Sequence, residues 1–124
     1  MNAVLYKLNY INSDKRIISC DSGSKEVDVS KIIYIESSGH KVTYHIYGKE
    51  FGGYVVKSKL DDIENELKEY KYLLRVHQSY IVNMMYVNNI SSYRVYLKNG
   101  IDLGVPKSRY KEVKKRILEF KENN

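Results

Sequence analysis

The chain has 124 residues, which is enough for one domain and excludes a second full one. Hydrophobic residues make up 43% and charged residues 29%, so the chain can bury a core and is not disordered by composition. One cysteine excludes an internal disulfide, and no apolar run reaches the ~18 residues that cross a bilayer. Residues 1–10 lack the pattern of a secretory signal, so we expect a cytoplasmic protein with no membrane segment.

Positive charge is concentrated in the second half of the chain. Residues 1–70 carry 10 basic and 11 acidic side chains, whereas residues 71–124 carry 11 basic and 4 acidic ones, a local net charge of +7. Such a block attracts and steers a polyanion, and nucleic acid is the commonest polyanion in a cytoplasm. A basic solvent-exposed surface without a partner would give the same charge count.

The aromatic residues are almost all tyrosines. Thirteen tyrosines stand against two phenylalanines and no tryptophan. Tyrosine favours half-exposed strands, where one side of the ring packs and the hydroxyl stays in water. The composition therefore predicts a mainly β fold.

The first predicted elements are strands. Residues 31–36 form an apolar β-branched run, and residues 42–46 alternate with a period of two, so both are expected to be strands. Between them, residues 37–41 are predicted to be a loop with polar side chains. A further strand is expected over residues 50–56, where Gly52-Gly53 indicates a bulge or a close backbone approach.

A short helix is predicted near residues 58–69. Ser58 and Asp61 have the spacing of a capping box, and Glu64 and Lys68 form an i,i+4 pair. The face expected to be buried consists of Leu60, Ile63 and Leu67.

Short strands follow, and then a hairpin. The predicted strands span residues 73–76, 80–82 and 86–90. Residues 93–105 form two alternating runs joined by Asn99-Gly100, a pair that favours a two-residue type I′ turn because both positions accept positive φ. That turn would place Tyr96 opposite Leu103, and Leu97 opposite Asp102.

The last predicted element is an amphipathic helix over Ser108–Phe120. Its apolar positions recur at helical spacing: Tyr110, Val113, Ile117 and Phe120. Its remaining surface is strongly basic: Lys111, Lys114, Lys115 and Arg116.

Motifs for catalysis are missing from the sequence. It contains no Gly-rich phosphate loop, CxxC pair, HExxH or nucleophile elbow. His40, His45 and His77 lack metal-ligand spacing, and the carboxylates of residues 61–69 have the spacing of a solvated helix face. We expect no catalytic residue, no metal site and no cofactor.

Three polar groups of residues lie at strand junctions: His40-Lys41, Arg75 to Ser79, and Pro106 to Tyr110. Loops held by a sheet can enter a DNA groove, where Arg recognises guanine, Gln recognises adenine, and Lys and Ser bind phosphates. Ordinary surface polarity is the competing interpretation, and His77 also fits a buried, hydrogen-bonded histidine.

The run from Leu74 to Asn83 resembles the signature of the LytTR family of bacterial DNA-binding domains. The shared pattern is Arg75-x-His77-x-Ser79, followed by an apolar run that closes with Val82-Asn83. Residues 32–37 resemble the family's first strong strand, and residues 97–110 its closing hairpin and Ser-Arg element. The resemblance covers about residues 18–120.

The resemblance implies a mainly β fold of three small antiparallel sheets stacked in a row, with a short helix. It implies that loops read successive major grooves of double-stranded DNA at direct repeats. The base-contacting residues it implies are His40, Gln78 and Arg109. The expected phosphate contacts are Lys41, Arg75, His77, Lys107, Ser108 and Lys111. Pro106-Lys107-Ser108-Arg109 departs from the family's Val-Ser-Arg with a further Arg.

The resemblance also implies the output domain of a response regulator that controls transcription. We expect a lead-in or linker over residues 1–15 and the domain over residues 16–124. The further partners implied are a receiver domain or RNA polymerase, with a monomer or weak dimer on DNA. Two alternatives remain open: an OB-type module that stacks single-stranded nucleic acid on tyrosines, and a β-sandwich that docks an acidic protein on the basic helix.

Overall fold

The computed structural model describes residues 14–49 and 53–123, and in this part of the chain three antiparallel sheets carry the fold. The central sheet has the order β5 (Tyr54–Lys57), β4 (Lys41–Ile46), β3 (Ile32–Ser38), β7 (Tyr80–Asn83) and β6 (Leu73–His77). A hairpin precedes it, with strands β1 (Lys15–Cys20) and β2 (Gly23–Asp28). The third sheet has the order β10 (Asp102–Gly104), β9 (Arg94–Leu97) and β8 (Val87–Ser91).

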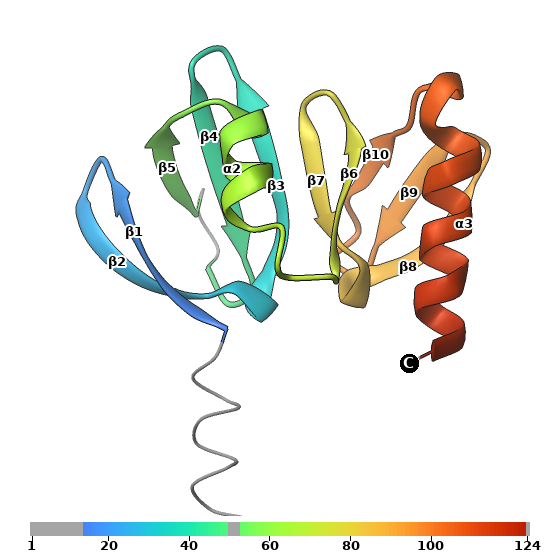
Figure 1. Ribbon diagram of the computed structural model, residues 1–124, viewed down its shortest axis with the longest axis horizontal. Coiled ribbons are helices and arrows are strands. Elements are labelled where there is room, and N and C mark those ends of the chain that lie inside the picture. Colours follow the sequence, from blue (N-terminus) through green and yellow to red (C-terminus); the bar gives the residue numbers. More distant parts are fainter. Residues whose placement is uncertain (1–13, 50–52, 124) are drawn as a thin grey trace, which may run out of the picture.

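The sheets follow one another along the long axis of the molecule (Figure 1). The β1–β2 hairpin lies at one end, and the third sheet lies at the other end with α3 (Lys107–Asn123). The short helix α2 (Leu60–Glu66) lies over the central sheet. Two 3-10 turns, η1 (Val29–Lys31) and η2 (Met84–Tyr86), each lead into a strand. The predicted mainly β fold with a short helix and a basic C-terminal helix is confirmed.

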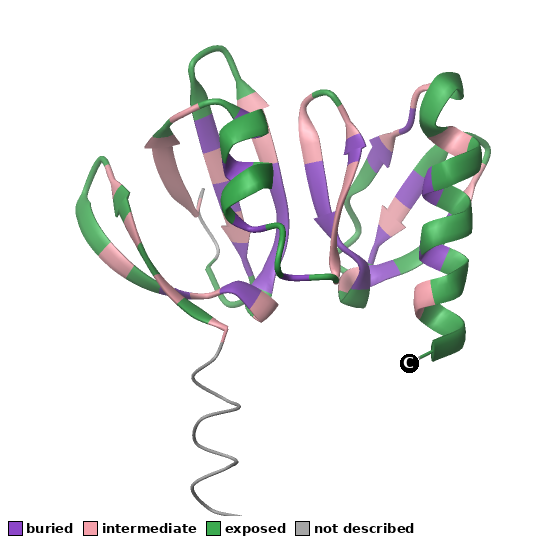
Figure 2. Cartoon of the chain, viewed as in Figure 1, coloured by how far each residue is buried: buried purple, intermediate pink, exposed green. Residues whose placement is uncertain are grey.

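Two hydrophobic clusters form the core, and strand β3 contributes to both of them. Ile32 and Ile35 pack into the cluster under α2, whereas Ile33 and Tyr34 pack into the cluster shared with the third sheet and α3. A strand buried on both faces has a nearly continuous apolar sequence, which explains the unbroken run at residues 32–35. Turns at the ends of the strands are exposed, and so is much of the β1–β2 hairpin (Figure 2).

A buried asparagine ties the central sheet together. Asn83 is fully buried, and its Nδ2 donates to the carbonyls of Ser30 at 3.0 Å and Ile32 at 2.9 Å. Its Oδ1 accepts a hydrogen bond from the backbone N–H of Met85 at 2.9 Å. These bonds satisfy the amide, whose burial would otherwise be costly.

The predicted start of the short helix is corrected. Lys59 occupies the N-cap position without a side-chain cap, and the Ser58 hydroxyl instead donates to the carbonyl of Lys59, so no capping box forms. Glu64 pairs with Arg75 on strand β6 rather than with Lys68. The predicted apolar face is confirmed, since its three residues are all buried: Leu60, Ile63 and Leu67.

The register of the last hairpin is corrected by one residue. Tyr96 pairs with Asp102 and Val95 with Leu103, which leaves a three-residue loop, Lys98 to Gly100, instead of a two-residue turn. The N–H of Leu97 donates to the carbonyl of Ile101 at 2.8 Å, and Gly100 has a φ of 88°. Such loops are typically a type I turn closed by a left-handed residue, so glycine is required at only one position.

The turn with two positive φ values instead joins β8 to β9. Ser91 pairs with Arg94, and the intervening Ser92 and Tyr93 have φ values of 53° and 63°. A left-handed conformation costs an L-residue roughly 1–2 kcal/mol, and for a bulky side chain it is unusual. This turn therefore has the backbone of a hairpin turn without its usual Asn-Gly sequence.

The remaining predicted strands are confirmed, and one lies partly outside the described residues. Residues 50–52 of the predicted 50–56 strand are not described, and β5 covers Tyr54–Lys57. Gly53 has a φ of 53°, and a Cβ there would overlap the carbonyl of Tyr44. The predicted close backbone approach therefore exists at this glycine. Of the predicted lead-in, only residues 14 and 15 are described.

Candidate nucleic-acid interface

Three junctions between elements lie along one edge of the molecule: the β3–β4 turn, the β6–β7 turn and the β10–α3 loop (Figure 1). The first two are joined by a hydrogen bond from the N–H of Ser37 to the carbonyl of Ser79 at 2.9 Å. Gly39 and Gln78 line one hollow there, and a second hollow extends from Arg75 to Arg109. His40, Gln78 and Arg109 are all exposed on this edge.

The β3–β4 turn has only two residues outside the strand pairing. Ser38 pairs with Lys41, which leaves Gly39 and His40 at the tip. Gly39 has a φ of 62° and nothing within 4 Å of the position of a Cβ, so backbone conformation alone calls for glycine. Among the described residues the His40 imidazole has no hydrogen-bond partner. The predicted loop over residues 37–41 is thus a tight turn with a free histidine at its tip.

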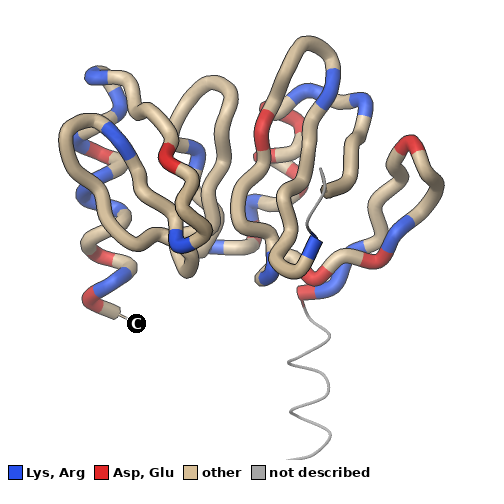
Figure 3. Tube along the Cα trace, turned by 180° about the vertical axis from the view of Figure 1, so that it is seen from behind, with Lys and Arg blue, Asp and Glu red and all other residues tan. Residues whose placement is uncertain are grey.

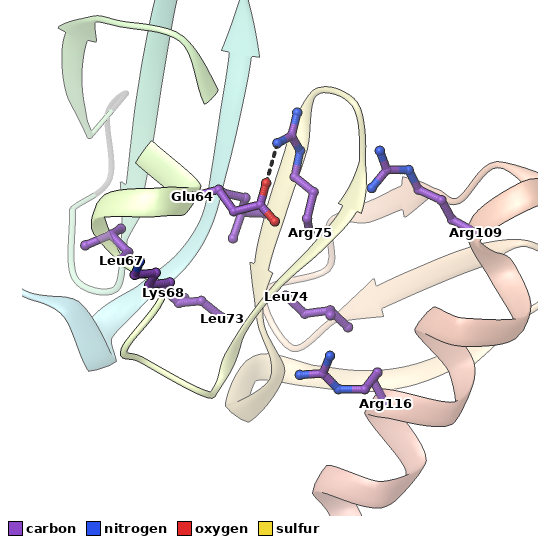
Figure 4. Close-up of a pocket in the computed structure, with 9 residues that line it drawn as sticks. Glu64, Leu67, Lys68, Leu73, Leu74, Arg75, Arg109 and Arg116 are labelled. Atoms are coloured by element: carbon purple, nitrogen blue, oxygen red, sulfur yellow. Dashed lines mark hydrogen bonds and ion pairs between the residues drawn. The ribbon is translucent and has the colours of Figure 1, made fainter. Parts of the chain in front are cut away.

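The β6–β7 turn is held by the Arg75 guanidinium. Its Nε donates to the carbonyl of His77 at 2.8 Å, and its Nη2 donates to the carbonyl of Gln78 at 2.5 Å. Its Nη1 lies 2.9 Å from carboxylate oxygens of both Asp61 and Glu64 on α2, and Figure 4 marks the bond to Glu64. Only 9% of the Arg75 side chain is exposed. Through these bonds the guanidinium of Arg75 joins α2 to the β6–β7 turn.

His77 also stabilises the β6–β7 turn, through a hydrogen bond within the turn and a ring contact. Its Nδ1 accepts a hydrogen bond from the N–H of Ser79 at 2.9 Å, and its ring lies 5.1 Å from the Tyr80 ring. This geometry matches the interpretation of His77 as a hydrogen-bonded structural histidine. Gln78, between two fixed neighbours, has its side chain exposed at the tip.

The first turn of α3 presents a cluster of exposed polar side chains. Lys107, Ser108 and Arg109 are all exposed, and the N–H of Arg109 donates to the carbonyl of Pro106 at 2.9 Å. Figure 4 shows the Arg109 side chain extended toward the β6–β7 turn, with Arg116 two turns further along α3. Neither arginine has a carboxylate partner among the described residues. Both guanidinium groups can therefore bind an anionic ligand.

Two lysines that the sequence interpretation missed also lie at this edge. Lys57 stands directly opposite Lys41 in the β4–β5 pairing, and Lys59 lines the hollow that contains Gln78. Like charges placed opposite each other on a sheet repel, and an anion bound between them would relieve the repulsion. Figure 3 shows Lys and Arg positions gathered at these strand ends. Their sequence positions carry no motif, and only the strand register brings Lys57 beside Lys41.

A row of rings supports the two turns from within the central sheet. Tyr34 stacks on His45 with 4.1 Å between ring centroids and meets the edge of Tyr80 at 6.5 Å. His45 Nε2 lies 2.7 Å from a carboxylate oxygen of Glu36. Burial, followed by the charge of Glu36, raises the pKa of Tyr34, so its hydroxyl stays neutral. This row of rings packs within the central sheet beneath the exposed turns.

The described residues contain no cluster of three or more His, Cys, Asp or Glu side chains that could hold a metal ion. No helix in the same part of the chain has the length and apolar character needed to span a membrane. The side chains at the edge include carboxylates as well as cations, an amide and hydroxyls, since Asp61 lines the hollow with Gln78 and Glu64 lines the hollow with Arg109.

The fold is a stack of small antiparallel sheets whose exposed turns on one edge bear cations and an amide, side chains that are suited to binding a polyanion. The family model of the LytTr DNA-binding domain matches residues 22–118, and the chain belongs to this family. It is therefore a DNA-binding domain.

A solved structure is similar in fold. It is the LytTr DNA-binding domain of a putative methyl-accepting/DNA response regulator from Bacillus cereus, with 23% sequence identity and a TM-score of 0.65. The match covers 85% of this chain and 96% of that one. No curated protein matches the sequence.

Proposed function

We propose that this domain reads the sequence of double-stranded DNA with the turns of this edge, each turn entering a successive major groove at direct repeats. The observation that carries the proposal is that three junctions lie along one edge of the molecule, and that each bears one exposed candidate residue, at position 40, 78 or 109, so that one duplex can meet all three. Side chains on loops held by a sheet keep a defined spacing, which sequence readout needs.

His40, Gln78 and Arg109 are the proposed base contacts. A glutamine amide can pair with adenine N6 and N7, and a guanidinium can pair with guanine O6 and N7, both in the major groove. Arg109 is free of carboxylate partners among the described residues, so its donors remain available. A histidine at a turn tip can donate or accept a hydrogen bond with a base edge.

Phosphate contacts are proposed for the exposed cations and hydroxyl that flank the base contacts: Lys41, Lys107, Ser108 and Lys111, with Lys57 and Lys59 added from their positions. Arg75 and His77 were also expected to touch phosphates. Their hydrogen bonds support a different assignment, in which both residues position the turn that carries Gln78.

The test compares binding of a duplex selected from a random library with binding of unselected duplex. Arg109→Ala is expected to weaken the selected duplex by about 1–3 kcal/mol and unselected duplex much less, while Lys111→Ala weakens both about equally. Equal losses from Arg109→Ala on the two duplexes would contradict its base-reading role. Better binding of single-stranded oligonucleotide than of duplex would instead favour the stacking module.

We further propose that the domain acts as the output of a bacterial transcription regulator, with a receiver domain or RNA polymerase as its protein partner. Residues 1–15 would then serve as the lead-in to the domain of residues 16–124, which would bind in the cytoplasm as a monomer or weak dimer. Footprinting is expected to show two protected copies of a repeat in the same orientation. Protection of an inverted repeat would contradict this arrangement.

A further inference from the structure

The β8–β9 turn packs against the first turns of α3, next to the proposed DNA-reading edge. The carbonyl of Tyr93 accepts a hydrogen bond from the N–H of Val105 at 2.9 Å. The ring of Tyr93 lies 4.5 Å from the ring of Tyr110, tilted by 45°. Tyr93 therefore belongs spatially to the segment that begins α3 and carries Arg109, although it is distant from that segment in sequence.

Two lysines flank this pair of rings. Lys107 Nζ lies 5.9 Å from the centroid of Tyr93, and Lys114 Nζ lies 5.8 Å from the centroid of Tyr110. Both distances are within the range of cation–π attraction, which helps hold an ammonium in place without neutralising it. Neither lysine has a carboxylate partner among the described residues. Positions 107, 111 and 114 recur along one side of α3, so their three charges form a stripe that starts at the edge.

Tyr93 occupies a position where asparagine or glycine is the usual choice. Its φ is 63°, and the residue is 46% exposed. Its hydroxyl has no hydrogen-bond partner among the described residues. Backbone strain is often retained where a side chain has a function. Packing on Tyr110 needs the ring but does not need the hydroxyl.

We propose that Tyr93, Tyr110, Lys107 and Lys114, hereafter the tyrosine–lysine cluster, bind backbone phosphates of duplex DNA beside the bases contacted by Arg109. The inference rests on the proposed function and extends the interface onto the outer side of α3. The cluster offers two phenol hydroxyls, of which that of Tyr93 is on the more exposed residue, and two ammonium groups, and these donors suit phosphate oxygens. The rings tilt against each other and carry ammonium groups nearby, so they are poorly placed to stack on bases.

The experiment measures affinity for a random-sequence duplex as a function of salt concentration. Each lysine that neutralises a phosphate contributes about 0.9 to the slope of log K against log salt. Lys114→Gln is expected to lower this slope by about 0.9, and Lys114→Arg is expected to restore it. Tyr93→Phe keeps the ring and is expected to lower affinity by about two- to tenfold, as for loss of one hydrogen bond, with the slope unchanged.

Lys98→Gln is the matched control. Lys98 is exposed and lines a hollow with Phe120 and Lys121 near the far end of α3, so it lies away from the edge. The Lys98→Gln substitution removes the same charge as Lys114→Gln and is expected to leave the slope at the wild-type value. Thermal unfolding of every variant verifies that the fold is kept.

The results separate the two proposals. Lys114→Gln and Tyr93→Phe could both keep the wild-type slope and affinity while Arg109→Ala still weakens binding of the selected duplex. That result would overturn the proposal for the tyrosine–lysine cluster and leave the proposed function standing. A loss in Lys98→Gln equal to that in Lys114→Gln would assign the effect to net charge and would also overturn it. Failure of the wild-type chain to bind any duplex would overturn both the proposed function and this inference.

Discussion

The turns that carry His40 and Gln78 are neighbours joined by one backbone hydrogen bond, yet they are built in different ways. The β3–β4 turn is shaped by its backbone alone, with a left-handed glycine and a histidine that has no hydrogen-bond partner among the described residues. The β6–β7 turn is fixed by side chains, since Arg75 holds two of its carbonyls and His77 accepts from a third residue.

This difference between the two turns means that one edge can combine a preorganised contact with an adaptable one. A turn clamped at several points loses little conformational entropy when its side chain binds, so Gln78 is preorganised. A free side chain on a two-residue turn must be ordered on binding, at some cost in affinity, but it can adapt to the groove. We therefore expect the two turns to respond differently to substitution.

The largest expected effect is that of Arg75→Ala. The substitution leaves the carbonyls of His77 and Gln78 without their donor and releases α2 from the turn, so the free energy of unfolding should fall by about 1–3 kcal/mol. Arg75→Lys should recover only part of the loss because an ammonium cannot reproduce the planar fork. Chemical denaturation checks the stability, and duplex binding checks the function.

Lys68→Ala is the control for this substitution. Lys68 lines the same hollow as Arg75 and makes no ion pair with the described residues. Its removal should change stability by less than about 0.5 kcal/mol. A similarly small effect of Arg75→Ala would contradict the clamped turn.

A smaller effect is expected from Gly39→Ala, which strains the unclamped turn. Gly39 and Gly48 have φ values of 62° and 86° with open space around each, so alanine at either should cost about 1 kcal/mol of stability. They lie at opposite ends of strand β4, and only Gly39→Ala should also weaken duplex binding. Equal binding by the two variants would remove the β3–β4 turn from the interface.

Substitution of the tip side chains themselves should leave the fold almost intact. His40→Ala and Gln78→Ala remove exposed side chains, so each should change the free energy of unfolding by less than about 0.5 kcal/mol. On the selected duplex, the preorganised Gln78 should contribute more than His40, within the roughly 1–3 kcal/mol of one base contact. Calorimetric binding of the two variants measures this difference, and a larger loss for His40→Ala would reverse the comparison.

The smallest change in the free energy of unfolding at neutral pH is expected from Tyr44→Phe, in the strand that follows the β3–β4 turn. Burial, followed by the charge of Glu66, raises the pKa of Tyr44, so the folded state favours the neutral phenol. Its contribution to stability is complete below the unfolded pKa of about 10 and is lost as pH rises toward the higher folded value. Tyr44→Phe should therefore reduce the loss of stability at alkaline pH, as measured by chemical denaturation. If the loss is the same as in the wild-type chain, the ionisation of other groups causes it.

Local sequence patterns were sufficient for most of the elements. Alternating and β-branched runs predicted the strands, and the spacing of Val113 and Ile117 predicted a basic helix with one buried side. The Arg75 to Asn83 motif indicated the family. These signals are short-range, because strand and helix periodicity follows from the geometry of the backbone itself.

Register and long-range contacts were determined by the tertiary structure. The hairpin loop at Lys98 to Gly100 is one residue longer than its Asn-Gly pair suggested, because pairing across the sheet sets the loop length. The position of Lys57 beside Lys41 and the contact of Tyr93 with Tyr110 also depend on pairing and packing.

The sequence by itself determined most of the elements and their amphipathic faces, but it did not predict the β1–β2 hairpin. Only the tertiary structure decided that Arg75 clamps a turn instead of facing outward, because its partners on α2 and the β6–β7 turn are brought together by packing of the sheet. An exposed arginine and a clamping arginine have the same sequence context, and they differ only in what folding places within hydrogen-bond distance of the guanidinium.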